Sequence, residues 1–86
     1  MKLVVEISLY PLQEDYIPHI KTFIERINQY ADIQVQTHAT STIVMGQYDD
    51  VMSMLSVEMK RSHEELGQGI FVCKFLNGDK ADITLS

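Results

Sequence analysis

Apolar and polar residues alternate strictly near the start of the chain. One set consists of Val5, Ile7 and Leu9, and the other of Glu6, Ser8 and Tyr10. A period of two places successive side chains on opposite faces of a half-buried β-strand. We therefore predict a strand over about Leu3 to Tyr10. Its hydrogen bonding should end at Pro11, because proline has no N–H to donate.

The apolar residues of the next segment recur at spacings of three and four, which is typical of an amphipathic helix. They are Ile17, Ile20, Ile24 and Ile27, with Phe23 beside them. Asp15 is a candidate N-cap, and Pro18 suits the first turn, where its missing N–H does no harm. The pattern predicts a helix that ends near Tyr30-Ala31.

A second stripe of the same spacing predicts a second helix. Its members are Val51, Leu55, Met59, Ser62 and Leu66, with Met52 packing alongside. Asp49 or Asp50 can cap the start of this helix, and Gly67 is a natural residue at its end.

Three further segments are predicted strands: 33–36, 42–47 and 70–76. His38-Ala39-Thr40 should turn the chain between the first two of them, and Asn77-Gly78 is a turn. Ile83-Thr84-Leu85 is a candidate for a short edge strand. The resulting order is β-α-β-β-α-β, so we expect an α+β fold, the ferredoxin-like sandwich, in which an antiparallel four-stranded sheet carries two helices on one face. Residues 1–86 form one domain in this prediction, with the first and third strands in the middle of the sheet.

The face of the sheet opposite the helices is predicted to be mixed in character. If Val5, Ile7 and Leu9 face the helices, then Phe71, Cys73 and Phe75 are their counterparts on the last strand. The open face would then collect Val4, Glu6, Ser8, Tyr10, Gln34, Gln36, His38, Thr42, Val44, Gly46, Ile70, Val72 and Lys74. Val4, Val44, Ile70 and Val72 would form an apolar patch of the kind that marks an interface. We expect a homo-oligomer, a dimer or a tetramer, built on this face, and the alternative is a monomer with a mottled surface.

Composition and charge restrict the function. A net charge of −5 argues against a nucleic-acid partner, and no apolar run is long enough to span a membrane. The lone Cys73 cannot form an internal disulfide, which favours a cytoplasmic location. His19, His38 and His63 lie far apart, so we expect no metal site, and His19 and His63 are interpreted as solvated helix residues. We find no nucleophile paired with a base, and therefore expect no enzyme and no cofactor.

A cluster of polar residues on the open face remains as the candidate site. Ser8 and Tyr10 lie near the end of the first strand, and Glu6 lies one strand step before Ser8 on the same face. The turn before the third strand supplies His38, Thr40, Ser41 and Thr42. Hydroxyls and an imidazole at sheet depth suit the hydrogen bonding of a planar heterocycle. The competing interpretation is that these residues are only β-formers and turn residues.

Two blocks of the chain resemble the YkoF-like proteins that bind thiamine or hydroxymethylpyrimidine. The blocks are Ile7-Ser8-Leu9-Tyr10-Pro11-Leu12, followed by Asp15-Tyr16-Ile17, and the run from Thr37 to Gly46, followed by Asp50-Val51. The resemblance implies a ferredoxin-like domain that pairs through its sheet and binds thiamine or its pyrimidine moiety without catalysis. It carries the ligand contacts onto Ser8, Tyr10 and Thr42, with Thr40 and Ser41 as neighbours. Because the chain holds a single copy of the domain, a two-fold site requires a second chain.

Two functions are compatible with these sequence features. The first is binding of thiamine or its pyrimidine relative at a sheet-face or oligomer-interface site, linked to thiamine uptake or salvage. The second is a regulatory or interaction module that oligomerises through its sheet without a small ligand. In either case a transporter component is a candidate partner.

Overall fold

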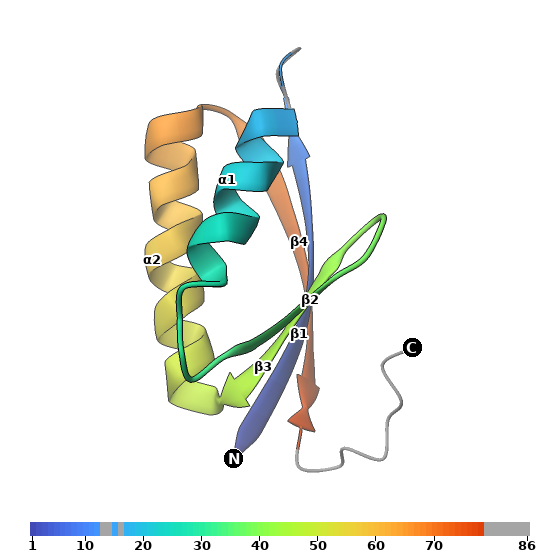
Figure 1. Cartoon of the computed structure of the whole chain (residues 1–86), viewed down its shortest axis with the longest axis vertical. Helices are drawn as coiled ribbons and strands as arrows, with labels where there is room; N and C mark the ends of the chain where they lie inside the picture. Colours follow the sequence, from blue (N-terminus) through green and yellow to red (C-terminus); the bar gives the residue numbers. More distant parts are fainter. Residues whose placement is uncertain (13–14, 16, 79–86) are drawn as a thin grey trace.

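The computed structural model describes residues 1–12, 15 and 17–78. The order of elements is β1 (Lys2–Pro11), α1 (Ile17–Ile27), β2 (Gln34–Thr37), β3 (Thr42–Gln47), α2 (Tyr48–Leu66) and β4 (Gly69–Asn77). Both helices lie on the same side of the sheet, and among residues 1–12, 15 and 17–78 no helix covers the opposite side (Figure 1). The predicted α+β, ferredoxin-like fold is confirmed.

The four strands form one antiparallel sheet in the order β2-β3-β1-β4. β1 and β3 are therefore the two central strands, as the sequence predicts. Val5 is the reference point of the register, because it lies opposite Val44 on β3 and Phe75 on β4.

The core lies between the sheet and the helices. Its buried members are Leu3, Val5, Ile7, Phe23, Ile27, Ile33, Val44, Val51, Met54 and Leu55. In α1 only Phe23 and Ile27 of the predicted stripe are buried, and Ile17 is 65% exposed. The helix also ends at Ile27, before the predicted Tyr30-Ala31. A short helix contacts a sheet over a narrow strip of its surface, so not all four isoleucines of the predicted stripe can be buried there.

α2 differs from its prediction in two details. It begins at Tyr48 after Gln47, so Asp49 and Asp50 occupy the first turn and neither is the N-cap. Met52, which is predicted to pack beside the buried stripe, is exposed. Met54 is buried in its place. The helix ends at Leu66, and Gly67 follows it as the predicted terminating glycine, with a positive φ of 82°.

The prediction for β3 on the open face is wrong by one residue. Thr42 and Val44 are buried on the helix side, at 6% and 0% exposure, and Gly46 lies opposite the buried Leu3. Ile43 and Met45 take their place on the open face, because they lie opposite Glu6 and Val4. The run Thr42-Ile43-Val44-Met45 has no polar alternation, and without it a strand can be assigned to either face.

β1 ends at Pro11, which pairs with Gly69, but its hydrogen bonding to the other strand continues beyond the predicted end, because the Leu12 N–H donates to the Gln68 carbonyl at 3.0 Å. The predicted strand at Ile83-Thr84-Leu85 lies outside the described residues. Within the described residues, neither helix has the length and apolar character needed to cross a bilayer.

Candidate functional site

A hollow opens between α1, the end of β1 and the turn that joins β2 to β3. Its volume is about 420 Å³, part of it open to solvent. One wall is apolar and comprises Ile7, Leu9, Ile20, Phe23 and Ile24. The other wall is the turn, with His38, Ala39, Thr40, Ser41 and Thr42. An apolar wall that faces a few hydrogen-bonding groups is typical of a pocket for a small heterocycle. We call this space the hairpin hollow.

Two hydrogen bonds fix the turn beside β1. The His38 N–H donates to the Ser41 carbonyl at 2.8 Å and closes the turn. The Ser8 hydroxyl donates to the Thr40 carbonyl at 3.3 Å. Pairing between β1 and β3 stops at Ile7, so Ser8 is the first residue of β1 that has no β3 residue opposite it. The hairpin of β2 and β3 leans past the sheet on the side away from the helices (Figure 1).

The structure brings most of the predicted site residues together. His38, Thr40, Ser41 and Thr42 all line the hairpin hollow, and Ser8 contacts them through Thr40. Thr42 is the deepest of them, with 6% of its surface exposed.

Glu6 and Tyr10 lie elsewhere, on the open face of the sheet. The Glu6 carboxylate is 3.5 Å from the Lys74 ammonium on β4. Tyr10 lies opposite Ile70 and is 55% exposed. Within one chain, therefore, neither side chain lines the hairpin hollow.

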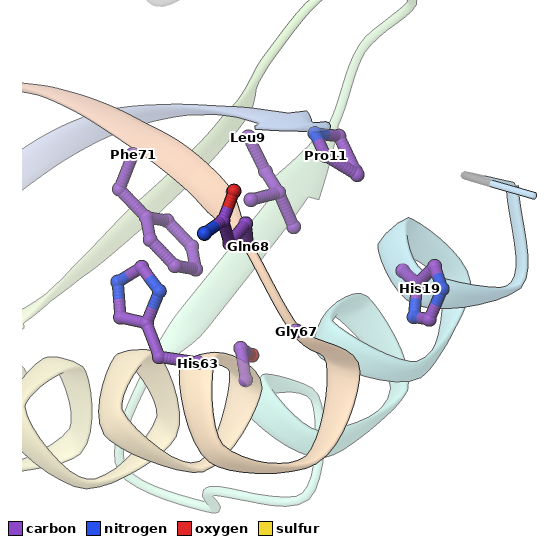
Figure 2. Close-up of a pocket in the computed structure, with 9 residues that line it drawn as sticks. Leu9, Pro11, His19, His63, Gly67, Gln68 and Phe71 are labelled. Carbon is purple, nitrogen blue, oxygen red and sulfur yellow. The ribbon is translucent and has the colours of Figure 1, made fainter. Parts of the chain in front are cut away.

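A second hollow lies at the end of α2, and its volume of about 240 Å³ includes space that is open to solvent. Its lining includes His19 from α1, Ser62 and His63 from α2, and Phe71 from β4. Figure 2 shows His19 on one side of this space and His63 below Phe71 on the other. The rings of His63 and Phe71 meet edge to face at 5.3 Å. Ser62 Oγ and His19 Nδ1 are buried without a hydrogen-bond partner among the described residues.

This second hollow is not predicted from the sequence. The helical pattern indicates a solvated His19, yet its Nδ1 atom is buried. Ser62 does lie on the buried stripe of α2, as predicted, and is 4% exposed. The Ser62 hydroxyl interrupts an otherwise apolar stripe, and a buried hydroxyl needs a polar neighbour. This is the feature of the sequence from which a polar space beneath the helix could have been predicted.

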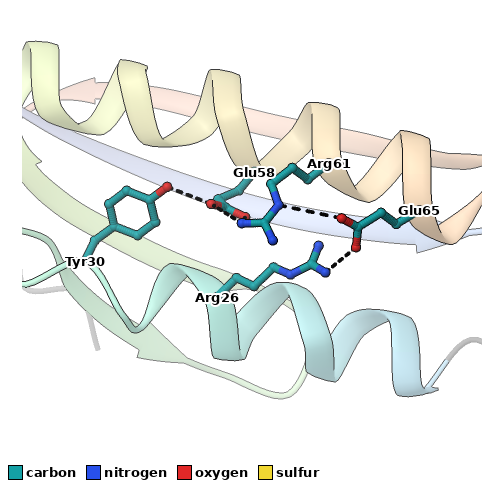
Figure 3. A network of polar contacts seen from close by, with 5 residues as sticks. All are labelled: Arg26, Tyr30, Glu58, Arg61 and Glu65. Atoms are coloured by element: carbon teal, nitrogen blue, oxygen red, sulfur yellow. Dashed lines mark hydrogen bonds and ion pairs between the residues drawn. The ribbon is translucent and has the colours of Figure 1, made fainter.

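A polar network ties the two helices together on another side of the molecule (Figure 3). The Tyr30 hydroxyl donates to the carboxylate of Glu58 at 2.6 Å, and Arg61 lies 3.4 Å from that carboxylate. Arg26 of α1 pairs with Glu65 of α2. The Arg26 guanidinium holds the pKa of the Glu65 carboxyl below its usual value. The hydrogen bond to Glu58 raises the pKa of Tyr30. The network links α1 and the segment that follows it to α2, and α1 forms one wall of the hairpin hollow.

No group of three or more His, Cys, Asp or Glu side chains that could hold a metal ion occurs among residues 1–12, 15 and 17–78. Cys73 is partly buried, and this burial raises the pKa of its thiol.

Solved structures with this fold come from several organisms. A protein from Streptococcus pneumoniae superimposes with a TM-score of 0.82 at 18% identity, over 96% of this chain and 100% of that one. A protein from Thermotoga maritima, provisionally named a thiamine biosynthesis/salvage protein, gives a TM-score of 0.81 at 20% identity, over 99% of this chain and 91% of that one. A hypothetical protein from Methanocaldococcus jannascii gives 0.76 at 23% identity, over 88% and 79%. Identities this low establish the fold alone.

The sequence defines the family more narrowly. Residues 3–83 match the model of the YKOF-related family, so the chain belongs to that family. Among curated proteins there is no significant match.

Proposed function

We propose that this protein binds thiamine or its hydroxymethylpyrimidine moiety without catalysing a reaction, and that it serves thiamine uptake or salvage. The family and the likeness to the Thermotoga protein named for thiamine biosynthesis or salvage support this proposal. The observation that carries it is the hairpin hollow, where four polar residues predicted from the sequence face an apolar wall.

The chemistry of the ligand suits the two walls of the hollow. An aminopyrimidine presents donors and acceptors along its edge, and the hydroxyls of Thr40, Ser41 and Thr42 can both donate and accept. Its flat ring can pack against Leu9 and Phe23, which line the opposite wall. A few neutral hydrogen bonds, each contributing about 0.5–1.5 kcal/mol, together with ring packing are enough for micromolar affinity.

Isothermal calorimetry with thiamine and with the free pyrimidine tests the proposal. Thr42→Val keeps the side-chain shape and removes one hydroxyl, so both ligands should bind roughly 3- to 10-fold more weakly. Ser62→Ala is the matched control, because it removes a buried hydroxyl from the second hollow and should leave both affinities unchanged. If Ser62→Ala weakens binding and Thr42→Val does not, the ligand lies in the second hollow. No heat from either ligand at millimolar concentration contradicts the function itself.

Glu6 provides a separate test of ligand charge. Glu6 lies outside the hairpin hollow, so we propose that its carboxylate favours the positive thiazolium ring of thiamine only at long range, and Lys74 at 3.5 Å offsets part of its charge. Glu6→Gln should then weaken thiamine more than the uncharged pyrimidine. An equal effect on the two ligands contradicts a role for this charge.

The open face supports a second candidate function, that of an interaction module. Its exposed or half-buried apolar residues are Ile43, Met45, Ile70, Val72 and Leu76. We propose that a second copy of the chain packs on this face, where it would also cover Glu6 and Tyr10. Met45→Lys should then weaken self-association in sedimentation equilibrium. Val57→Lys, which changes an exposed residue of α2, is the control. A monomer at all concentrations contradicts this assembly and leaves a transporter component as the partner to test.

A further inference from the structure

Ser8 lies where the two central strands of the sheet separate. Pairing between β1 and β3 ends at Ile7 with Thr42, whereas pairing between β1 and β4 continues to Pro11. If the first register continued, Ser41 would lie opposite Ser8. Instead, the hairpin of β2 and β3 leans away from the helices beyond this point (Figure 1). The turn at its tip therefore lies beside β1 without a strand ladder to hold it there.

The Ser8 side chain reaches this turn from the open face of the sheet. Its neighbours Ile7 and Leu9 both line the hairpin hollow, which lies on the helix side. Successive side chains of a strand alternate, so Ser8 points to the opposite side and is not one of the described residues that line the hollow. From the open face its hydroxyl donates to the Thr40 carbonyl at 3.3 Å.

Packing does little to fix the turn itself. His38, Ala39 and Thr40 are exposed, and exposed segments with few buried contacts open easily. A hydrogen bond within the turn, from the His38 N–H to the Ser41 carbonyl, maintains its shape. The bond from Ser8 is of a different kind, because it ties the turn to β1. The position of the turn relative to the apolar wall of the hollow therefore depends on Ser8.

We propose that Ser8 is a positioning residue for the ligand of the hairpin hollow and makes no contact with it. This inference rests on the proposed function, because it assigns Ser8 a role in the same site. By binding the Thr40 carbonyl, the hydroxyl keeps the polar turn at a fixed separation from the apolar wall on α1. A flat heterocycle then enters a gap that is already formed, and little ordering of the turn is required on binding.

The size of the effect follows from how often the turn is ordered. A ligand that binds only the ordered turn loses apparent affinity in proportion to the fraction of molecules in which the turn is ordered. Loss of a neutral hydrogen bond changes such an equilibrium about 2- to 10-fold. Ser8→Ala should therefore weaken thiamine and the free pyrimidine by similar factors, of up to about 10-fold.

Amide hydrogen exchange in the ligand-free protein separates positioning from direct contact. In Ser8→Ala the His38 amide should exchange about 2- to 10-fold faster. Ser8→Thr retains the hydroxyl on a residue that suits a strand, so it should restore both the slow exchange and the affinity. Ser8→Val has the shape of that threonine without its hydroxyl and should behave like Ser8→Ala, even if alanine destabilises the strand. Ser56→Ala removes an exposed hydroxyl from α2 and is the control that should change neither quantity.

Isothermal calorimetry with thiamine and with hydroxymethylpyrimidine completes the test. Weaker binding by Ser8→Val than by Ser8→Thr, with equal exchange of the His38 amide in the two free proteins, would make Ser8 a direct contact. That result overturns the positioning role and leaves the proposed function standing. Equal affinity of the two variants also overturns it. No binding by the wild type contradicts the proposed function itself, and the positioning role with it.

Discussion

Glu58 is a carboxylate in an unusual position, at 2% exposure on the inner side of α2. Burial of a charge is costly unless hydrogen bonds and an opposite charge replace the lost water. Tyr30 donates one hydrogen bond, and Arg61 supplies the positive charge from the next turn of the same helix. The side chain is therefore tolerated because of two specific neighbours.

Tyr30→Phe removes the donated hydrogen bond and should lower the free energy of unfolding by about 1–3 kcal/mol at neutral pH. The raised pKa of Tyr30 adds a pH dependence. The folded protein retains this proton above pH 10.0, where the unfolded chain loses it, so the contribution is constant below pH 10.0 and declines as pH rises further. Urea titrations should show the difference between wild type and variant shrinking above pH 10.0.

The control for this prediction is Tyr48→Phe, because Tyr48 is 42% exposed. It should leave stability unchanged at neutral pH. A constant difference between wild type and Tyr30→Phe on both sides of pH 10.0 would contradict the proposed coupling.

Single residues also mark the limit of what the sequence predicts. Alternation identifies the faces of β1 correctly, because Glu6 and Ser8 interrupt the apolar residues. It fails in β3, where Thr42, Ile43 and Val44 include no strongly polar side chain. The burial of Glu58 could not be predicted, because a glutamate on a helix is normally exposed and its partner Tyr30 is distant in sequence.

At the scale of elements, Gly67 separates α2 from β4. Its φ of 82° and ψ of −152° lie in a region that is accessible almost solely to glycine. This conformation reverses the chain, so that β4 can return along β1. The sequence predicts the end of the helix here correctly, because a glycine after the last turn is a local feature that needs no tertiary contact.

Gly67→Ala should lower the free energy of unfolding by about 1–3 kcal/mol, because a Cβ strains this backbone conformation. Gly69→Ala is the matched control two residues further on. Its added Cβ would make an ordinary contact with Leu9 Cδ1 at 3.5 Å, so we expect little change. Denaturant unfolding measures the free energy of unfolding of both variants. Equal decreases in the two variants would contradict the assignment of strain to Gly67.

The two candidate hollows show why elements are easier to predict than sites. Thr40, Ser41 and Thr42 are consecutive residues, so their proximity follows from the chain itself. The second hollow joins His19, Ser62 and Phe71 from three elements, and their meeting depends on how the helices pack over β4. Spacing along a sequence contains no such information.

At the scale of the molecule, one face of the sheet is covered by the two helices, and no helix of the described residues covers the other (Figure 1). Apolar residues remain exposed both on that open face and along β4. A small domain buries a limited share of its surface, so association with a second copy is an effective source of stability.

If the chain self-associates, its melting temperature should rise with protein concentration, because the dimer forms only from folded chains. Met45→Lys on the open face should make the melting temperature independent of concentration, and Val57→Lys should keep the dependence. Differential scanning calorimetry over a wide range of concentrations measures both. A wild-type melting temperature that does not change with concentration would contradict self-association.

The central position of β1 has a consequence for how the chain reaches its native state. β1 pairs with β4, so that Leu3 lies opposite Asn77 and almost the whole described chain separates the two partners. Contacts between such distant segments are slow to form, because a long loop must close before they become favourable. During synthesis, β1 keeps one edge unpaired until β4 has emerged, and the exposed edge is then available to chaperones or to neighbouring nascent chains.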